Sequence, residues 1–166
     1  MRLAAFSDSH GDTYALRFAL EEAIKRGMVD VFAFLGDGVQ DFYDLHGLMK
    51  RHNPSAMCYA VRGNNDYARH GLPEESVVSF GPLWVYLAHG HRQRVKLTDA
   101  FIFADARERQ CTIALFGHTH RAFLGEKDGV LCMNPGSVAL PTGKGPSFGL
   151  LTSSSEGNVT TEIVFL

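Results

Sequence analysis

Five short apolar runs in the sequence each end in glycine and in polar side chains that can bind a metal ion. Carboxylate, imidazole and amide groups are ligands of first-row divalent metals. Because a carboxylate has two oxygens, Asp37, which stands alone after its apolar run, can bridge two ions. A metal site follows if the fold brings these positions together. They are Asp8 and His10, Asp37, Asn64 and Asp66, His89 and His91, and His118 and His120.

The spacing within two of these groups favours a shared site. Asp8 and His10 flank Ser9, and His118 and His120 are separated by one residue in the same way. In an extended chain, residues two apart point to the same side. We therefore expect each pair to direct two side chains into one crevice. The glycines beside these groups suit tight turns and close approach of the backbone.

The apolar runs themselves predict buried β-strands. Short continuous apolar segments bounded by turn residues are typical of strands covered on both faces. In open α/β sheets, sites form beyond the carboxyl ends of the strands, which is where each polar group lies. Polar groups far apart in sequence should therefore converge. The predicted strands are residues 3–6, 31–35, 58–61, 84–88 and 112–116.

Helices are predicted between several of these strands. Residues 14–26 form a helix capped by Asp12 or Thr13, with Gly27 as its end. Two further helices cover residues 41–51 and 99–109, the latter capped by Thr98. The last third of the chain differs, because it reads as a hairpin with its turn at Asp128-Gly129, followed by strands at 148–152 and 159–165. This pattern predicts an α/β fold of two packed sheets flanked by helices.

Composition and charge narrow the class of protein. The 166 residues fit one domain, 1–166, and a net charge of −2 makes nucleic acid an unexpected stable partner. The apolar segment 3–6 is too short for a signal-peptide core, and no stretch approaches a membrane span, so we expect a cytoplasmic protein. Three cysteines with irregular spacing indicate reduced thiols. The possibility of a homo-oligomer stays open.

Five motifs in a fixed order resemble the calcineurin-like metallophosphoesterase family. They are Asp8-x-His10, Gly36-Asp37, Gly63-Asn64-x-Asp66, His89-Gly90 and Gly117-His118-x-His120. One of these motifs alone would be weak evidence for the family, whereas five motifs in this order are strong evidence. The likeness is greatest to the small bacterial and archaeal single-domain phosphodiesterases, and it extends over essentially the whole chain.

The resemblance implies a four-layer α/β/β/α sandwich of two mixed sheets and a dinuclear metal centre. It also implies that Asp37 and a hydroxide bridge the ions, and that the hydroxide attacks a small phosphate-ester substrate. Mn²⁺ is the expected metal, with Fe, Zn and Ni as alternatives. The implied ligands are Asp8, His10 and His120 for one ion and Asn64, His89 and His118 for the other.

One position departs from the family pattern. Many members carry histidine after the motif asparagine, where it serves as a general acid, but this chain carries Asn65. An amide cannot donate a proton in acid catalysis, although it can hydrogen-bond a phosphate oxygen. His91 is then a second candidate catalytic residue, and the alternative is that it only ends a loop. Asp66 is expected to orient the metal ligands without contacting the ions itself.

Other readings of the same features stay open. The same centre would suit a phosphomonoesterase or a dinucleotide polyphosphate hydrolase. A non-catalytic interaction scaffold is the alternative of another class, since one eukaryotic retromer subunit shares the resembled fold with several ligands altered. Every ligand position matches here, which favours the enzyme.

Several polar residues have a simpler interpretation when taken alone. Arg92, Arg94 and Lys96 could bind phosphate, but a charge run is usually a solvated face. Asp41 is expected to cap a helix, and residues 134–137 to form a turn near the site. The remaining histidines are expected in solvent, namely His46, His52 and His70.

Overall fold

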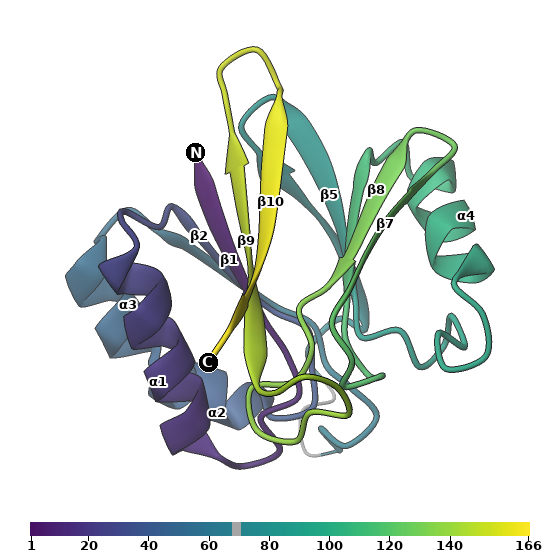
Figure 1. The fold of residues 1–166 in the computed structure, drawn as a ribbon. Helices are drawn as coiled ribbons and strands as arrows, with labels where there is room; N and C mark the ends of the chain where they lie inside the picture. Colours follow the sequence, from purple (N-terminus) through teal and green to yellow (C-terminus); the bar gives the residue numbers. More distant parts are fainter. Residues whose placement is uncertain (68–70) are drawn as a thin grey trace.

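Two five-stranded sheets face each other in the computed structural model, which describes residues 1–67 and 71–166 (Figure 1). The strands of the first sheet are β1 (Arg2–Phe6), β2 (Val31–Phe34), β3 (Met57–Ala60), β9 (Ser147–Ser153) and β10 (Val159–Phe165). Those of the second sheet are β4 (Glu75–Phe80), β5 (Leu83–Ala88), β6 (Ile113–Phe116), β7 (Phe123–Lys127) and β8 (Val130–Asn134). The strand order is β10-β9-β1-β2-β3 in the first sheet and β4-β5-β6-β8-β7 in the second.

Both sheets are mixed, and their central strands are covered on both faces. In β1, Leu3 and Ala5 belong to the core between the sheets, whereas Ala4 and Phe6 belong to the core under the helices. This explains why the strand is apolar at every position rather than at alternate ones. β1, β2 and β3 run parallel, as do β5, β6 and β8, so the carboxyl ends that matter lie at one end of the sandwich.

Helices form the outer layers. Figure 1 shows α1 (Thr13–Lys25), α2 (Val39–Asp44) and α3 (His46–His52) beside the first sheet and α4 (Ala100–Glu108) beside the second. The buried face of α1 packs on the first sheet, and that of α4 on the second. The four-layer α/β/β/α sandwich is therefore confirmed.

Local signals placed most elements correctly. Asp12 caps α1 by accepting from the Ala15 N–H at 2.9 Å, and the β7–β8 hairpin turns at Asp128-Gly129 as predicted.

The three cysteines form no disulfide among the described residues, and two of them, Cys111 and Cys132, are buried. The part of the chain described by the structure contains no helix long and apolar enough to cross a membrane.

One prediction of secondary structure was wrong, and one strand was missed. The helix expected over 41–51 is two helices, because Leu45 leaves helical geometry with φ −94° and ψ 2° while its side chain stays in the core. No glycine or proline marks that break. Strand β4 was not predicted, since its mixed sequence has neither a continuous apolar run nor a clean alternation; it forms because it pairs antiparallel with β5.

The core between the sheets should carry much of the stability. Leu115 is fully buried there, whereas Leu124 on β7 is 46% exposed. Leu115→Ala should lower the free energy of unfolding by about 2–5 kcal/mol, because it leaves a cavity. Leu124→Ala removes the same atoms from the surface and should cost about 0.5 kcal/mol. Urea unfolding of both variants checks this, and equal losses would contradict the assignment of the core.

Candidate metal centre

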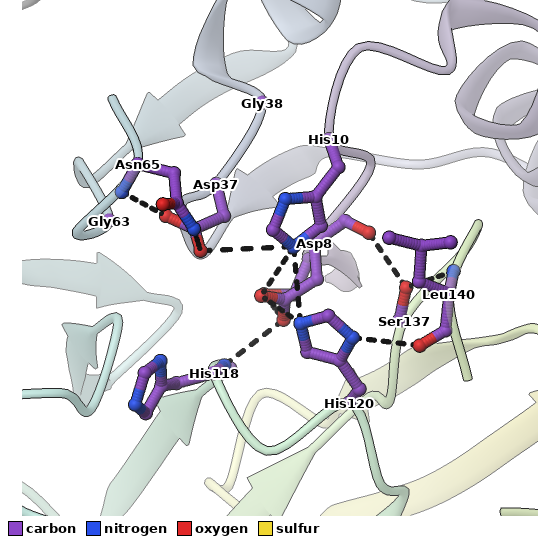
Figure 2. A network of polar contacts seen from close by, with 12 residues as sticks. Asp8, His10, Asp37, Gly38, Gly63, Asn65, His118, His120, Ser137 and Leu140 are labelled. Atoms are coloured by element: carbon purple, nitrogen blue, oxygen red, sulfur yellow. Dashed lines mark hydrogen bonds and ion pairs between the residues drawn. The ribbon is translucent and has the colours of Figure 1, made fainter. Parts of the chain in front are cut away.

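The polar groups that follow five strands meet at one end of the sandwich. The loops come from β1, β2 and β3 of one sheet and from β5 and β6 of the other. Figure 2 shows Asp8, His10 and His120 facing one another, with Asp37 beside them. The structure therefore brings together the residues that the sequence analysis singled out as ligands.

Asp8, His10 and His120 form the first group of possible ligands, with ligand atoms all within 4.8 Å of one another. Asp8 Oδ1 lies 3.3 Å from His120 Nε2 and 3.8 Å from His10 Nε2. The two Nε2 atoms are 3.1 Å apart. His120 Nδ1 donates to the Leu140 carbonyl at 2.7 Å, so in the neutral ring Nε2 presents a lone pair to this point.

The surroundings of the Asp8 carboxylate indicate whether a cation would fit the first group. Asp8 is fully buried, and its Oδ2 accepts hydrogen bonds from Ser7 Oγ at 2.6 Å and the His118 N–H at 3.0 Å. Its Oδ1 has no hydrogen-bond donor among the described residues. A buried anionic oxygen beside imidazole lone pairs is unfavourable unless a positive charge lies among them. A divalent ion fits this arrangement.

Asp37, His89 and His118 form the second group, also with ligand atoms within 4.8 Å. His89 is fully buried, and its Nδ1 donates to the Leu35 carbonyl at 2.6 Å. Its Nε2 lies 3.4 Å from Asp37 Oδ2 and 3.2 Å from Asn64 Oδ1. Asn64 therefore lies where an amide oxygen can complete this group.

The Asp37 carboxylate lies between the two groups. Its Oδ2 is 3.4 Å from His89 Nε2 in one group and 3.8 Å from His10 Nε2 in the other. Burial alone raises the pKa of Asp37, but His89 and the two N–H donors of Asn65 outweigh burial and hold the pKa below its usual value. Asp37 is thus a charged carboxylate with one oxygen directed at both groups.

The backbone at these residues is not extended, which corrects the expected reason for their convergence. Five of the possible ligands have φ between 49° and 67°, in the left-handed region: Asp8, His10, Asp37, His118 and His120. Residues other than glycine adopt this region rarely, although Asp and His tolerate it better than most. The loops curl rather than extend, and strain of this kind gathers at functional sites.

The histidines differ in how readily they take a proton. Burial and the neighbouring His89 lower the pKa of His118 to about 4. The Asp8 side chain raises the pKa of His120, although the burial of His120 acts in the opposite direction. Burial alone would lower the pKa of His89, but its hydrogen bond with Asp37 and the charge of Asp8 raise it. Protons and metal ions therefore compete for the same nitrogens of His89 and His120.

Asn65 and Asp66 hold the loops in place. The Asn65 amide donates to Asp37 Oδ2 at 2.6 Å, and its backbone N–H donates to Oδ1 at 2.8 Å. The side chain predicted to contact phosphate thus contacts a possible ligand. The Asp66 carboxylate accepts from four backbone N–H groups, those of Asp37, Gly38, Val39 and Gly63, at 2.7–3.1 Å. It orients the region as expected and also caps α2.

Three supporting residues were missed or undervalued by sequence reasoning. Asp41 lies inside α2 rather than capping it, and its carboxylate accepts from Ser9 Oγ at 2.6 Å and the Gly11 N–H at 2.9 Å, which fixes the loop around His10. Ser137 Oγ donates to the Asp8 carbonyl at 2.7 Å. Asn134 donates to the Gly117 carbonyl at 2.7 Å. The turn at 134–137 was predicted, but these long-range bonds leave no local signal.

The other histidines lie outside the two groups. The His91 ring centre is 5.4 Å from that of His89, and its buried Nδ1 has no hydrogen-bond partner in the described part of the chain. His46 is exposed, as predicted. His52 is not simply solvated, because its Nε2 accepts from the Val29 N–H at 3.1 Å. His70 lies outside the described residues.

Two glycines are required by close approach. A Cβ on Gly63 would lie 2.1 Å from Asp37 Oδ1, and one on Gly117 would lie 2.0 Å from Ser7 Oγ and 2.9 Å from Asp8 Oδ2. Either side chain would displace a carboxylate of the centre. The glycines next to the polar residues are therefore part of the site.

Two relatives of this chain are phosphoesterases by name. "Probable metallophosphoesterase YsnB" of Bacillus subtilis is 31% identical over 160 residues, covering 94% of this chain and 86% of that protein. "Phosphodiesterase MJ0936" of Methanocaldococcus jannaschii is 26% identical over 169 residues, covering 94% of this chain and 95% of that protein.

A structural comparison shows a shared fold, and a family profile matches the sequence. A Vps29 variant from Entamoeba histolytica superposes with a TM-score of 0.73 at 22% identity, covering 99% of this chain and 98% of that one, which shows a shared fold. The profile of the calcineurin-like phosphoesterase superfamily domain matches residues 1–156. The chain belongs to the calcineurin-like phosphoesterase superfamily.

Proposed function

We propose that this chain is a phosphodiesterase that uses two divalent metal ions. The observation that carries the proposal is the pair of His/Asp groups, each with ligand atoms within 4.8 Å of one another, joined by Asp37. Asp8, His10 and His120 would hold one ion, and Asn64, His89 and His118 the other. Mn²⁺ is the proposed metal, and Fe, Zn and Ni suit the same nitrogen and oxygen donors.

The charge of the centre suits an anionic substrate. Two divalent ions contribute +4 and the Asp8 and Asp37 carboxylates −2, which leaves +2 in a chain whose net charge is −2. When bound, such a metal pair would supply an ionised water near neutral pH and would neutralise charge on a phosphate. The residues of this chain orient that chemistry, since Leu140 and Leu35 fix the tautomers of His120 and His89.

Protonation of the leaving group is the step for which this chain lacks the histidine that is usual in the family. Asn65 positions Asp37 and cannot give up a proton. His91 is the alternative proton donor, because its ring centre lies 5.4 Å from that of His89 and 6.1 Å from that of His118. Burial and the nearby His89 lower the pKa of His91, which disfavours the protonated form that could donate. We therefore favour diesters with good leaving groups over alkyl monoesters.

The scaffold alternative has less support. Likeness to Vps29 at 22% identity concerns the fold. The ligand positions of this chain are all filled by ligand-type side chains that converge, and the relatives described above are named as phosphoesterases. Nothing among these observations requires a protein partner to complete the site.

Asp37→Asn should reduce hydrolysis of bis(4-nitrophenyl) phosphate by more than about a hundredfold. Changing a residue that only hydrogen-bonds a metal ligand costs roughly 10–100-fold, and the loss of a bridging ligand should cost more. Asp44→Asn, on the exposed face of α2, is the matched control and should keep full activity. Circular dichroism checks that both variants fold. Activity of Asp37→Asn above about a tenth of wild type would contradict the bridging role.

Asn65→His should raise kcat/KM for esters with poor leaving groups more than for nitrophenyl esters. A general acid contributes about 10²–10⁴-fold when the departing oxygen needs a proton, and little otherwise. The measurement is kcat/KM against leaving-group pKa for wild type, Asn65→His and Asn65→Gln, the last of which keeps an amide. A wild type without leaving-group dependence would assign the acid to another residue, His91 first.

A further inference from the structure

A cavity of about 550 Å³ opens next to the loop that carries His118 and His120. Its walls are the loop 95–99, the end of β6 and the segment 119–123 that follows the ligand loop. Thr119, which lines the cavity, lies between His118 and His120 in the chain, so the cavity and the candidate centre share this loop. The volume lies within the roughly 300–1,000 Å³ of small-molecule sites.

One part of the cavity wall is apolar. Phe116 and Phe123 line it with ring centres 6.0 Å apart, and Val95 lies on the same wall. Side chains of this kind bind planar rings through dispersion and burial of apolar area. A single phosphate would gain nothing from such a wall.

Two cations line the same cavity. Lys96 and Arg121 are exposed, and neither side chain forms an ion pair or hydrogen bond with the residues that the structure describes. Arg92, three residues before Val95, differs because Glu74 pairs with it. Lys96 is near enough to the centre to help lower the pKa of His118. Asp99 is the acidic residue of the wall, so the cations outnumber the acid.

We propose that this cavity binds the part of the substrate beyond the scissile phosphate, and that this part carries a planar ring and a second anionic group, as a nucleoside phosphate does. The inference rests on the proposed phosphodiesterase function. One phosphate would lie at the candidate metal centre and the second beside Lys96 and Arg121. The ring would lie against Phe116 and Phe123.

The roles of the wall residues follow from this placement. Lys96 and Arg121 select for the second charge, and the aromatic wall selects against inorganic phosphate and pyrophosphate. Asp99 can accept a hydrogen bond from a hydroxyl or amino group of the ligand. The basic residues of the segment 92–96 thus have different roles. Arg92 forms an ion pair with Glu74, whereas Lys96 lines the cavity and can bind a ligand.

Calorimetry on the Mn²⁺-loaded full chain tests this with adenosine 5′-diphosphate, pyrophosphate and inorganic phosphate as probes. Lys96→Gln and Arg121→Gln should each weaken binding of the adenosine diphosphate about tenfold, since each removes a charged hydrogen-bond donor. Binding of inorganic phosphate should be unchanged. Lys127→Gln, on an exposed lysine at the end of β7 and outside the cavity, is the matched control and should change neither. Metal content is measured for every variant.

Adenosine diphosphate should also bind wild type about tenfold more tightly than pyrophosphate, because only it carries a ring. Equal affinities of these two probes would overturn the ring assignment. Equal weakening of all probes by Lys96→Gln and Arg121→Gln, or no weakening, would overturn the anion assignment. Failure of the proposed function gives a different result: the wild type would not hydrolyse bis(4-nitrophenyl) phosphate, while the pattern of probe binding would persist.

Discussion

Two buried carboxylates impose the constraint on which the site depends. Asp8 is 0% exposed and Asp37 is 1% exposed, and a buried charge costs several kcal/mol unless it is compensated. Asn65 donates to Asp37 through two N–H groups, and Ser7 and His118 donate to one oxygen of Asp8. The other oxygen of Asp8 and the imidazole lone pairs around both carboxylates remain for a cation, so the same burial that is costly for the bare chain favours a divalent ion.

The fold supplies the rigidity that holds this arrangement. Left-handed backbone at five possible ligands costs about 1–3 kcal/mol each by general experience, and it persists only where the surroundings enforce it. Asp66 binds four backbone N–H groups and Asp41 fixes the loop around His10, while both sheets hold the strands from which the loops leave. The ligands are thus placed by residues that would not touch a metal themselves.

The order of layers and the set of converging residues were predictable because they depend on patterns within short windows. Apolar runs that end in glycine mark covered strands, and motif order marks the family. The break at Leu45, strand β4 and the carboxylate of Asp41 were not predictable, since each depends on contacts with segments remote in sequence. The left-handed loops were also missed, because the spacing of His118 and His120 is equally compatible with an extended chain. The curled form is held by contacts with remote residues, such as the hydrogen bond from Asn134 to the Gly117 carbonyl.

Anomalous diffraction from crystals grown with Mn²⁺ would show whether two ions share this centre, because it locates ions without relying on activity. We predict two ions per chain about 3.5–4 Å apart. One should contact Asp8, His10 and His120, and the other Asn64, His89 and His118, with Asp37 touching both. A single ion, or two ions that do not share Asp37, would contradict a dinuclear centre at this end of the sandwich.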